Sequence, residues 1–206
     1  MCYTSIFRRI RKIVPQLPDT MGKPVDCAID FTGFKITIRG DYPGNKWHKH
    51  RRGRIKLHAV ISIHDVLVLS SSITDDHVHD AKEGRKILES VKDGMLRIFG
   101  DKGYESKGIF NEFGFNTVIP PRRNASTQSG GSPARAKIVR QIRRTGEKEW
   151  KESVQYGKRW NVEIYFLGLK RTMGEVIKAV RPDYIVQEIA LKVQYYNTMR
   201  GMAHAY

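Results

Sequence analysis

The most informative stretch of this 206-residue sequence is Tyr156-Gly-Lys-Arg159-Trp-Asn-Val-Glu163-Ile-Tyr-Phe-Leu-Gly-Leu-Lys170. On a helix each residue advances by about 100°, so its tyrosine, arginine, glutamate and final lysine fall within about 60° of one another. The other residues are mostly apolar and surround the axis, which predicts a buried helix. A buried carboxylate needs a cation, a metal or hydrogen-bond donors beside it. The spacing therefore fits either a functional glutamate or an ion-pair ladder of Arg159, Glu163 and Lys170.

Two aspartates follow apolar runs elsewhere in the chain. Asp30 ends the run Val-Asp-Cys-Ala-Ile-Asp, and Asp101 ends Met-Leu-Arg-Ile-Phe-Gly-Asp. Each is followed closely by a glycine, Gly33 or Gly103, which suits a site that a backbone or a metal must approach. Either aspartate alone would be explained more readily as a turn residue. As a pair at the ends of two strands in a parallel-type sheet, they favour one shared site.

The order of the predicted elements indicates an α/β protein with a mixed sheet and flanking helices. Apolar runs and alternation predict the strands, with a Thr-Gly bend between the first two, and helical periodicity predicts the helices. Polar turn formers at about 121–137 predict a mobile loop. The predicted strands cover 25–30, 32–39, 54–64, 66–70, 95–101 and 116–119, and the predicted helices cover 81–91, 105–113, 146–170 and 184–199.

The chain is strongly basic. It has 37 Lys and Arg against 21 Asp and Glu, a formal net charge of +16 and a pI near 10.0, which favours a polyanionic partner such as nucleic acid. Two basic clusters are candidates for DNA contact, although each could also be a solvated charged face. The first comprises Lys46, Lys49, Arg51, Arg52, Arg54 and Lys56, with Trp47 among them, and the second comprises Arg135, Lys137, Arg140, Arg143 and Arg144. His58, next to the first cluster, is expected to orient its neighbours or to contact DNA.

Several other classes of protein are disfavoured. No run of about 18 apolar residues could span a bilayer, and the charged start of the chain argues against a secretory leader, so we expect a cytoplasmic, nucleoid-associated protein. Cys2 and Cys27 make no disulfide framework. The paired histidines at 48 and 50 and at 77 and 79 lack cysteine partners at ligand spacing, which argues against zinc.

The pattern Tyr-x2-Arg-x3-Glu-x6-Lys of residues 156–170 resembles the signature of bacterial and archaeal insertion-sequence DDE transposases. Four further segments are similar to blocks of that family, in the same order, so that the resemblance runs from about residue 25 to about residue 199. They are the first-aspartate segment at 30–35, the second-strand block at 52–58, the second-aspartate block at 100–104 and a proline-arginine segment at 120–124.

The resemblance implies the ribonuclease H-like fold of retroviral integrases and metal-dependent DNA cleavage and strand transfer. It implies that Asp30, Asp101 and Glu163 hold Mg²⁺ or Mn²⁺, as two ions, for an in-line displacement at phosphorus. It further implies that Tyr156, Arg159 and Lys170 grip the DNA backbone near the scissile bond. The implied partners are transposon-end and target DNA, and the implied active form is a homodimer.

Two departures from the family pattern qualify this interpretation. A helical region usually precedes the first aspartate, so we interpret residues 1–24 as a basic segment remaining from a DNA-binding region and residues 25–206 as the catalytic domain. The chain also has no room for a large inserted domain before Glu163. Two alternatives stay open: a ribonuclease H-like nuclease that cuts without joining, and a truncated or domesticated remnant that only binds DNA. The presence of all three acids argues against decay of the site.

Overall fold

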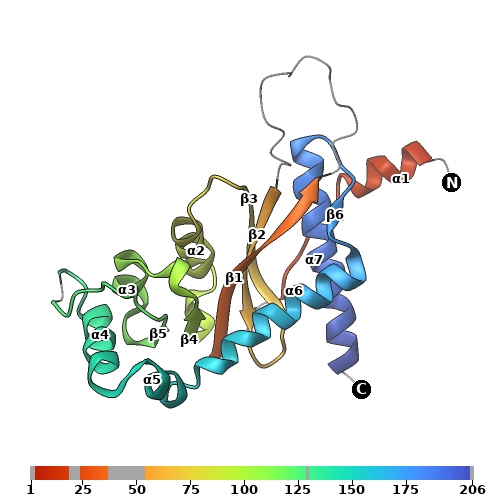
Figure 1. Cartoon of the computed structure of the whole chain (residues 1–206). Helices are drawn as coiled ribbons and strands as arrows, with labels where there is room; N and C mark the ends of the chain where they lie inside the picture. Colours follow the sequence, from red (N-terminus) through yellow and green to blue (C-terminus); the bar gives the residue numbers. More distant parts are fainter. Residues whose placement is uncertain (1–2, 19–23, 37–53, 129, 205–206) are drawn as a thin grey trace, which may run out of the picture.

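The computed structural model describes residues 3–18, 24–36, 54–128 and 130–204. Within these residues six strands form one mixed sheet in the order β3-β2-β1-β4-β5, and β6 pairs with the end of β1 (Figure 1). The strands are β1 Val25–Ile36, β2 Arg54–Ser62, β3 Val68–Asp75, β4 Met95–Gly100, β5 Thr117–Val118 and β6 Val176–Ile177. The α-helices are α1 Tyr3–Ile10, α2 Asp80–Glu89, α3 Lys107–Phe113, α4 Pro133–Thr145, α5 Glu147–Ser153, α6 Trp160–Met173 and α7 Pro182–His204, and the 3₁₀ turns are η1 Lys92–Gly94, η2 Lys102–Tyr104, η3 Gly114–Asn116 and η4 Tyr156–Arg159.

The long strand β1 is central to the sheet. It runs antiparallel to β2 in unbroken register from Cys27↔Ser62 to Lys35↔Arg54, and its other edge is parallel to β4 and, further along, to β6. The predicted bend between two strands is therefore wrong, because Thr32 and Gly33 lie inside the ladder. Residues 37–39 of the second predicted strand lie outside the described part of the chain. The mixed sheet itself confirms the predicted ribonuclease H-like fold.

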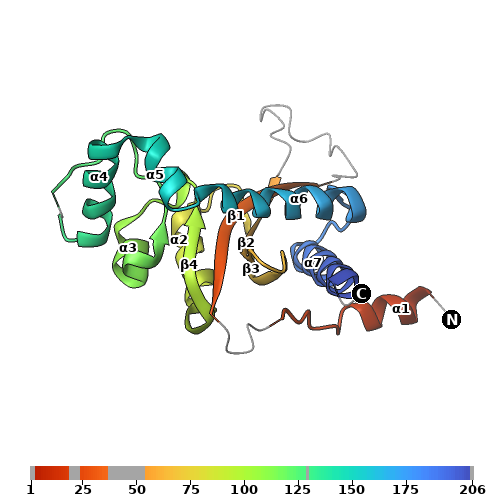
Figure 2. The same cartoon turned by 90° about the horizontal axis from the view of Figure 1, so that it is seen from below.

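Alternation along β1 directs successive side chains to different helical layers. The side chain of Ile29 faces α2: a Cβ built on Gly84 would lie 3.0 Å from it and 2.6 Å from the ring of Tyr104. Glycine at position 84 is thus what allows α2 to approach this closely. On the other face, the ammonium groups of α6 and α7 lie 5.8 Å from the ring of Phe34. Asp30 shares the face of Phe34, so it points toward α6, which runs along β1 (Figure 2).

Helix α7 ties the edge of the sheet to α6. The side chain of Asn197 accepts from the backbone N–H of Val68 at 3.1 Å and donates to its carbonyl at 2.8 Å, satisfying the open edge of β3. The hydroxyl of Tyr165 on α6 donates to the same Asn197 at 2.8 Å. Both polar side chains are almost fully buried, so this bridge fixes α6 against the sheet.

Two sequence predictions about the second half of the chain differ from the structure. Part of the predicted loop at 121–137 is helical, because Pro133 begins α4 with a φ suited to a first helical turn, and Ala134 and Ala136 are buried. The predicted helix over 146–170 is instead α5, η4 and α6, interrupted at Gln155, whose φ of 57° is left-handed.

The prediction that the signature helix is buried is correct for only one side of α6. Val162, Tyr165, Phe166 and Leu169 are buried, whereas Trp160, Ile164 and Leu167 are exposed. The apolar residues of α6 therefore lie on two sides of the helix, one packed against the sheet and one exposed. None of the described helices combines the length and apolar composition needed to cross a bilayer.

Candidate active site

Asp30 and Asp101 lie side by side at the edge between β1 and β4. The parallel ladder ends at Ile29↔Gly100, so each aspartate is the next residue of its own strand. The backbone of Asp101 is still extended, with φ −83° and ψ 177°. Neighbouring strands lie about 4.8 Å apart, and residues at the same level of parallel strands point to the same face. The two carboxyl groups therefore share the face that α6 covers.

A backbone donor fixes the orientation of Asp101. The N–H of Gly103 donates to Asp101 Oδ1 at 2.8 Å. A Cβ on residue 103 would lie 2.9 Å from that same oxygen, which is closer than side-chain carbons approach. Glycine is consequently required for this turn in its present form, which explains the Asp-x-Gly pattern after β4.

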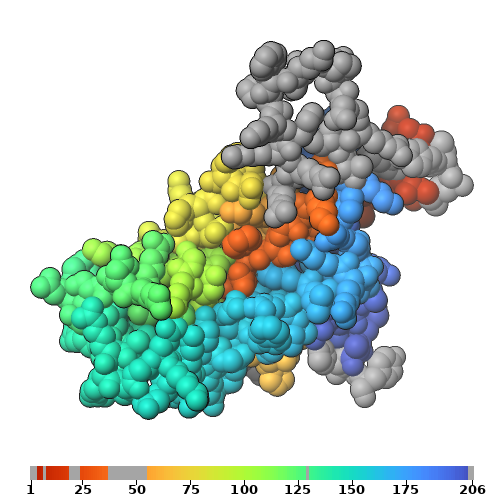
Figure 3. Space-filling view, in the orientation of Figure 1, coloured from red at the N-terminus to blue at the C-terminus, as the bar shows by residue number. Residues whose placement is uncertain are grey.

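Glu163 joins these acids through Arg159. Arg159 Nη1 donates to Asp30 Oδ2 at 2.7 Å, and Arg159 Nη2 donates to Glu163 Oε1. The Arg159 and Asp30 side chains are 18% and 15% exposed, so water screens this contact little. The Arg159–Glu163 pair of the ion-pair-ladder alternative is present, and the structure adds Asp30 to it. Figure 3 shows β1 and α6 side by side at the surface of this face.

The turn η4 is anchored to both strands that carry the aspartates. The hydroxyl of Tyr156 donates to the carbonyl of Gly100 at 3.0 Å, directly before Asp101. Lys158 Nζ lies 3.2 Å from a carboxylate oxygen of Asp26, and Arg97 donates to both oxygens of that carboxylate at 2.9 and 2.5 Å. These contacts place Arg159, the next residue, over Asp30.

Burial shapes the electrostatics of Asp30. Removal from water, and then the negative charge of Asp101, raise the pKa of Asp30 to about 6, against the lowering effect of the Phe31 N–H and Arg159. By contrast, the hydrogen bond from Arg97 lowers the pKa of Asp26 from its ordinary value. Ionisation of Asp30 therefore costs free energy in the folded protein, whereas the negative charge of Asp26 is stabilised by its neighbours.

Replacing Asp26 with asparagine should destabilise the protein by about 1–3 kcal/mol at pH 7, because it leaves Arg97 and Lys158 without their shared carboxylate. Since the pKa of Asp26 is lowered in the fold, the native aspartate contributes stability above its ordinary pKa near 4 and loses it as the pH falls further. Urea denaturation at pH 7 and pH 3 would measure this. A difference between the variant and the native protein that is as large at pH 3 as at pH 7 would contradict the role of the ion pair.

The structure distributes the remaining predicted DNA-contacting residues unevenly. Lys170 lies further along α6, with its ammonium 5.8 Å from the Phe34 ring. Lys56 pairs with Asp80 at 2.9 Å and is only 12% exposed. Residues 46–52 of the first cluster lie outside the described residues, and for Arg54 only the backbone of β2 is described. In the second cluster Arg135 pairs with the buried Glu105.

The assignment of His58 to DNA contact does not fit its position. Its side chain is completely buried, on the α2 face of the sheet opposite the acids. The ring nitrogens lie 3.4 Å from the Tyr104 hydroxyl and 3.0 Å from Thr74 Oγ1. Burial also lowers the pKa of His58, which keeps the ring neutral. The histidine therefore supports the layer beneath the site.

The chemistry of the donor set at the acids fits a hard divalent ion. Asp30, Asp101 and Glu163 offer carboxylate oxygens, which Mg²⁺ and Mn²⁺ prefer. As these side chains stand, however, no three acidic, histidine or cysteine residues in the described part of the chain are gathered tightly enough to hold an ion. The guanidinium of Arg159 lies between Asp30 and Glu163.

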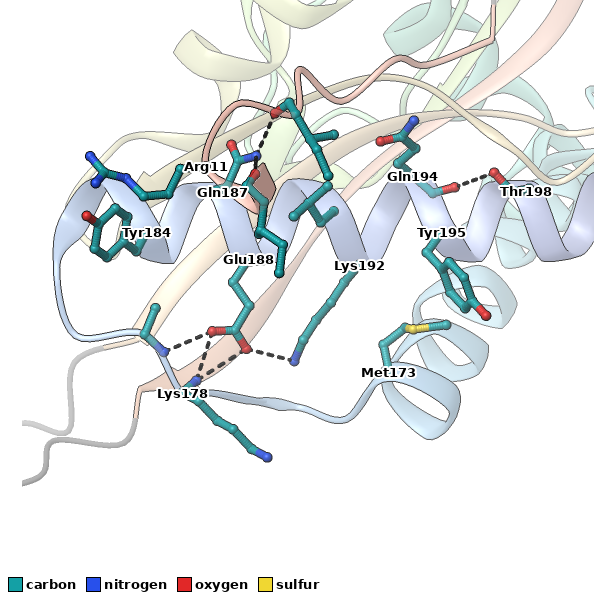
Figure 4. A pocket seen from close by; sticks show the side chains of 14 residues that line it. Arg11, Met173, Lys178, Tyr184, Gln187, Glu188, Lys192, Gln194, Tyr195 and Thr198 are labelled. Carbon is teal, nitrogen blue, oxygen red and sulfur yellow. Dashed lines mark hydrogen bonds and ion pairs between the residues drawn. The ribbon is translucent and has the colours of Figure 1, made fainter. Parts of the chain in front are cut away.

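A groove is present on the molecule away from the three acids. It has a volume of about 800 Å³ and runs between residues 10–13 and the outer side of α7, near Met173 at the end of α6 (Figure 4). Its lining includes Tyr184 and Tyr195 but none of the three acids. The candidate site is therefore defined by its converging charges and not by the size of a cavity.

Comparison with known proteins agrees with the fold. The sheet order and its flanking helices place the chain in the ribonuclease H-like class. Residues 21–197 match the family model of the transposase DDE domain, so the chain belongs to the DDE transposase family, whose members are nucleases and transesterases that act on DNA. A search of curated proteins found no match.

Sequence reasoning missed the residues that position the site. Asp26, Arg97 and Lys158 form the anchor of η4, and no spacing rule links them. One signal was present: Arg97 interrupts the apolar run of β4, and Lys158 lies inside the signature segment. A charged residue within a buried strand needs a partner, so Arg97 indicated an acid on a neighbouring strand without identifying Asp26.

Proposed function

We propose that this chain is the catalytic domain of a transposase that cleaves DNA and transfers the resulting 3′ end to a target, with Asp30, Asp101 and Glu163 as ligands of two divalent ions. The observation that carries the proposal is the meeting of three acids from distant segments on one face. Two are neighbours across the β1–β4 ladder, and the third is linked to Asp30 by one guanidinium.

The three acids have distinct positions in the proposed chemistry. Divalent ions bound there would supply activation of a water or 3′-hydroxyl and stabilisation of the leaving oxygen. Asp30, whose side chain is 15% exposed against 35% for Glu163, would contact both ions, while Asp101 and Glu163 would each complete one. Gly103 holds Asp101 in place, and Tyr156 holds η4 against β4. Arg159, Tyr156 and Lys170 are proposed to contact phosphates near the scissile bond.

Plasmid nicking tests the proposal against its alternatives. The native protein and Glu163→Gln would be incubated with supercoiled DNA and Mn²⁺, and then with a precut 3′-hydroxyl duplex and a target. We expect nicking and joining by the native protein and neither by the variant. Nicking without joining would favour the ribonuclease H-like nuclease, and DNA binding without nicking would favour the binding-only remnant. Equal nicking by both proteins would refute the site. Sedimentation with paired-end DNA would test the proposed homodimer.

A basic surface leads away from Asp101 and is proposed to carry DNA. Lys102 follows this acid and pairs with Glu147 at 3.1 Å, at the start of α5. A groove of about 160 Å³ there is lined by Lys102, Arg122, Arg123 and Arg143. On α4 a second groove, of about 500 Å³, is lined by Lys137, Arg140, Gln141 and Arg144. Both grooves are lined by residues of α4, and Lys102 of the first groove directly follows Asp101 in the chain.

Removing two cations of this surface should weaken DNA binding in a salt-dependent manner. For Arg140→Gln/Arg144→Gln we expect the slope of log K against log salt to become shallower by about 1–2, since each lost phosphate contact removes nearly one released counterion. Fluorescence anisotropy with a duplex would measure it. The matched control is Lys82→Gln/Lys86→Gln on α2, which packs on the face opposite α6. An equal change in both double variants would mean that only net charge matters.

A further inference from the structure

Arg159 joins two of the acids that the proposed function assigns to metal ions. One terminal nitrogen donates to Asp30 at 2.7 Å and the other to Glu163, so both ends of the planar guanidinium are engaged. Arg159 and Glu163 are one helical turn apart, whereas Asp30 lies on a strand more than a hundred residues earlier in the chain. The guanidinium therefore occupies the space between carboxylates that a divalent ion would need to reach.

We infer that Arg159 competes with divalent ions for Asp30 and Glu163, and that ion binding displaces its guanidinium toward the DNA phosphates. This inference rests on the proposed function, because it takes these two acids as ion ligands. A guanidinium and a divalent cation repel each other strongly at contact distance, so both cannot hold the same carboxylate oxygens. Each ion that binds must first break the Arg159 contacts, which lowers the apparent ion affinity.

The neighbouring cations are engaged with other groups. Lys158 is directed to Asp26, and Arg97 is bound to the same carboxylate. Within the described residues, Arg159 is the cation in ion-pair contact with Asp30 and with Glu163. Its side chain is still 18% exposed, and the adjacent Trp160 is 61% exposed, so the guanidinium lies next to open solvent. A change of rotamer could bring it to a ligand at the surface without moving the sheet.

This arrangement links ion binding to DNA binding. A phosphate that attracts Arg159 outward frees the carboxylates for ions, and ions that occupy the carboxylates release Arg159 for a phosphate. By linkage, DNA and the divalent ion must each raise the affinity of the other by the same factor. Arg159 would thereby keep the acids neutralised in the absence of DNA and favour ion loading once DNA is present.

Mn²⁺ binding, followed by the loss of the electron paramagnetic resonance signal of free Mn²⁺, tests the inference without any reaction. We expect Arg159→Gln to bind Mn²⁺ about tenfold more tightly than the native protein. The matched control Arg171→Gln removes the same charge from an exposed position on α6 and should bind like the native protein. Arg159→Lys keeps the charge but lacks the planar, two-ended guanidinium that spans Asp30 and Glu163, so its affinity should lie between the two. Circular dichroism melting would verify that each variant is folded.

The outcomes separate the inference from the proposed function. Equal Mn²⁺ affinity of folded Arg159→Gln and the native protein, or weaker binding by the variant, would overturn the competition while leaving the ion site intact, provided that Glu163→Gln binds Mn²⁺ poorly. Mn²⁺ binding that is unaffected by Glu163→Gln would overturn the proposed site itself. Saturating duplex should tighten Mn²⁺ binding by the native protein and not by Arg159→Gln. Identical effects of duplex on both proteins would overturn the linkage.

Discussion

Asp30→Asn is expected to lower Mn²⁺-dependent plasmid nicking by at least about a thousandfold, with little loss of DNA affinity. The amide keeps the shape of the side chain and can still receive the Phe31 N–H, which lies 2.8 Å from Asp30 Oδ1 in the native protein. It removes the negative charge that the proposed ions require. Initial rates of nicking and anisotropy with the same duplex would measure the two quantities.

The matched control for this variant is Asp93→Asn, an exposed aspartate in η1. It makes the same chemical change outside the site and should nick at the native rate. Retention of more than a tenth of native nicking by Asp30→Asn would remove Asp30 from the catalytic set. An equally large loss of DNA affinity would instead indicate that the variant fails to fold or that the Asp30 carboxylate organises the DNA-binding surface.

The fold could be predicted because its deciding features are local. The alternation of apolar residues in β2 and the apolar runs ending at Asp30 and Asp101 follow directly from strand geometry and burial. The order of strands and helices then favoured a mixed α/β sheet, which the structure confirms. The resemblance of the signature segment to DDE transposases is also confirmed at the level of the family.

The sequence-based predictions were wrong where contacts between distant segments of the chain determine the local structure. Thr32 and Gly33 look like a turn, yet pairing with β2 keeps them in one strand. Gln155 adopts a left-handed backbone conformation, which glutamine does not favour, so the break before η4 could not be predicted from the sequence. The exposed side of α6 has apolar residues that pattern analysis assigns to a core. The charge-bearing contacts of Asp26 and Arg97 depend on the register of β1 and β4, which the sequence leaves undetermined.

The contacts among the three acids combine the two interpretations that the sequence left open. Three acids on one face repel one another, and the chain relieves this by placing Arg159 between Asp30 and Glu163. The stripe of residues 156–170 left two interpretations open, a functional glutamate and an ion-pair ladder of Arg159, Glu163 and Lys170. In the structure the same arginine reaches Asp30 as well, so the ion pair and the proposed catalytic site involve the same residues.

Asp30 should also make the protein less stable as the pH rises, and Asp30→Asn should remove this effect. Its pKa is raised to about 6, first by burial and then by Asp101, against an ordinary value near 4. An acid with a raised pKa contributes stability that is complete below about pH 4 and is lost as the pH increases through about 6. Between pH 4.5 and 7.5, without divalent ions, the stability of Asp30→Asn relative to the native protein should therefore increase by about 1–3 kcal/mol.

Urea denaturation in EDTA at several pH values would measure this difference, with Asp93→Asn as the exposed control. The same titration predicts that Mn²⁺ affinity of the native protein decreases as the pH falls below about 6, because protons then compete with the ion for Asp30. A pH-independent difference between Asp30→Asn and the native protein would show that burial of this carboxylate has no energetic cost. If the difference follows the predicted course, the charge of Asp30 lowers the stability of the fold, and ion binding at this acid offsets that loss.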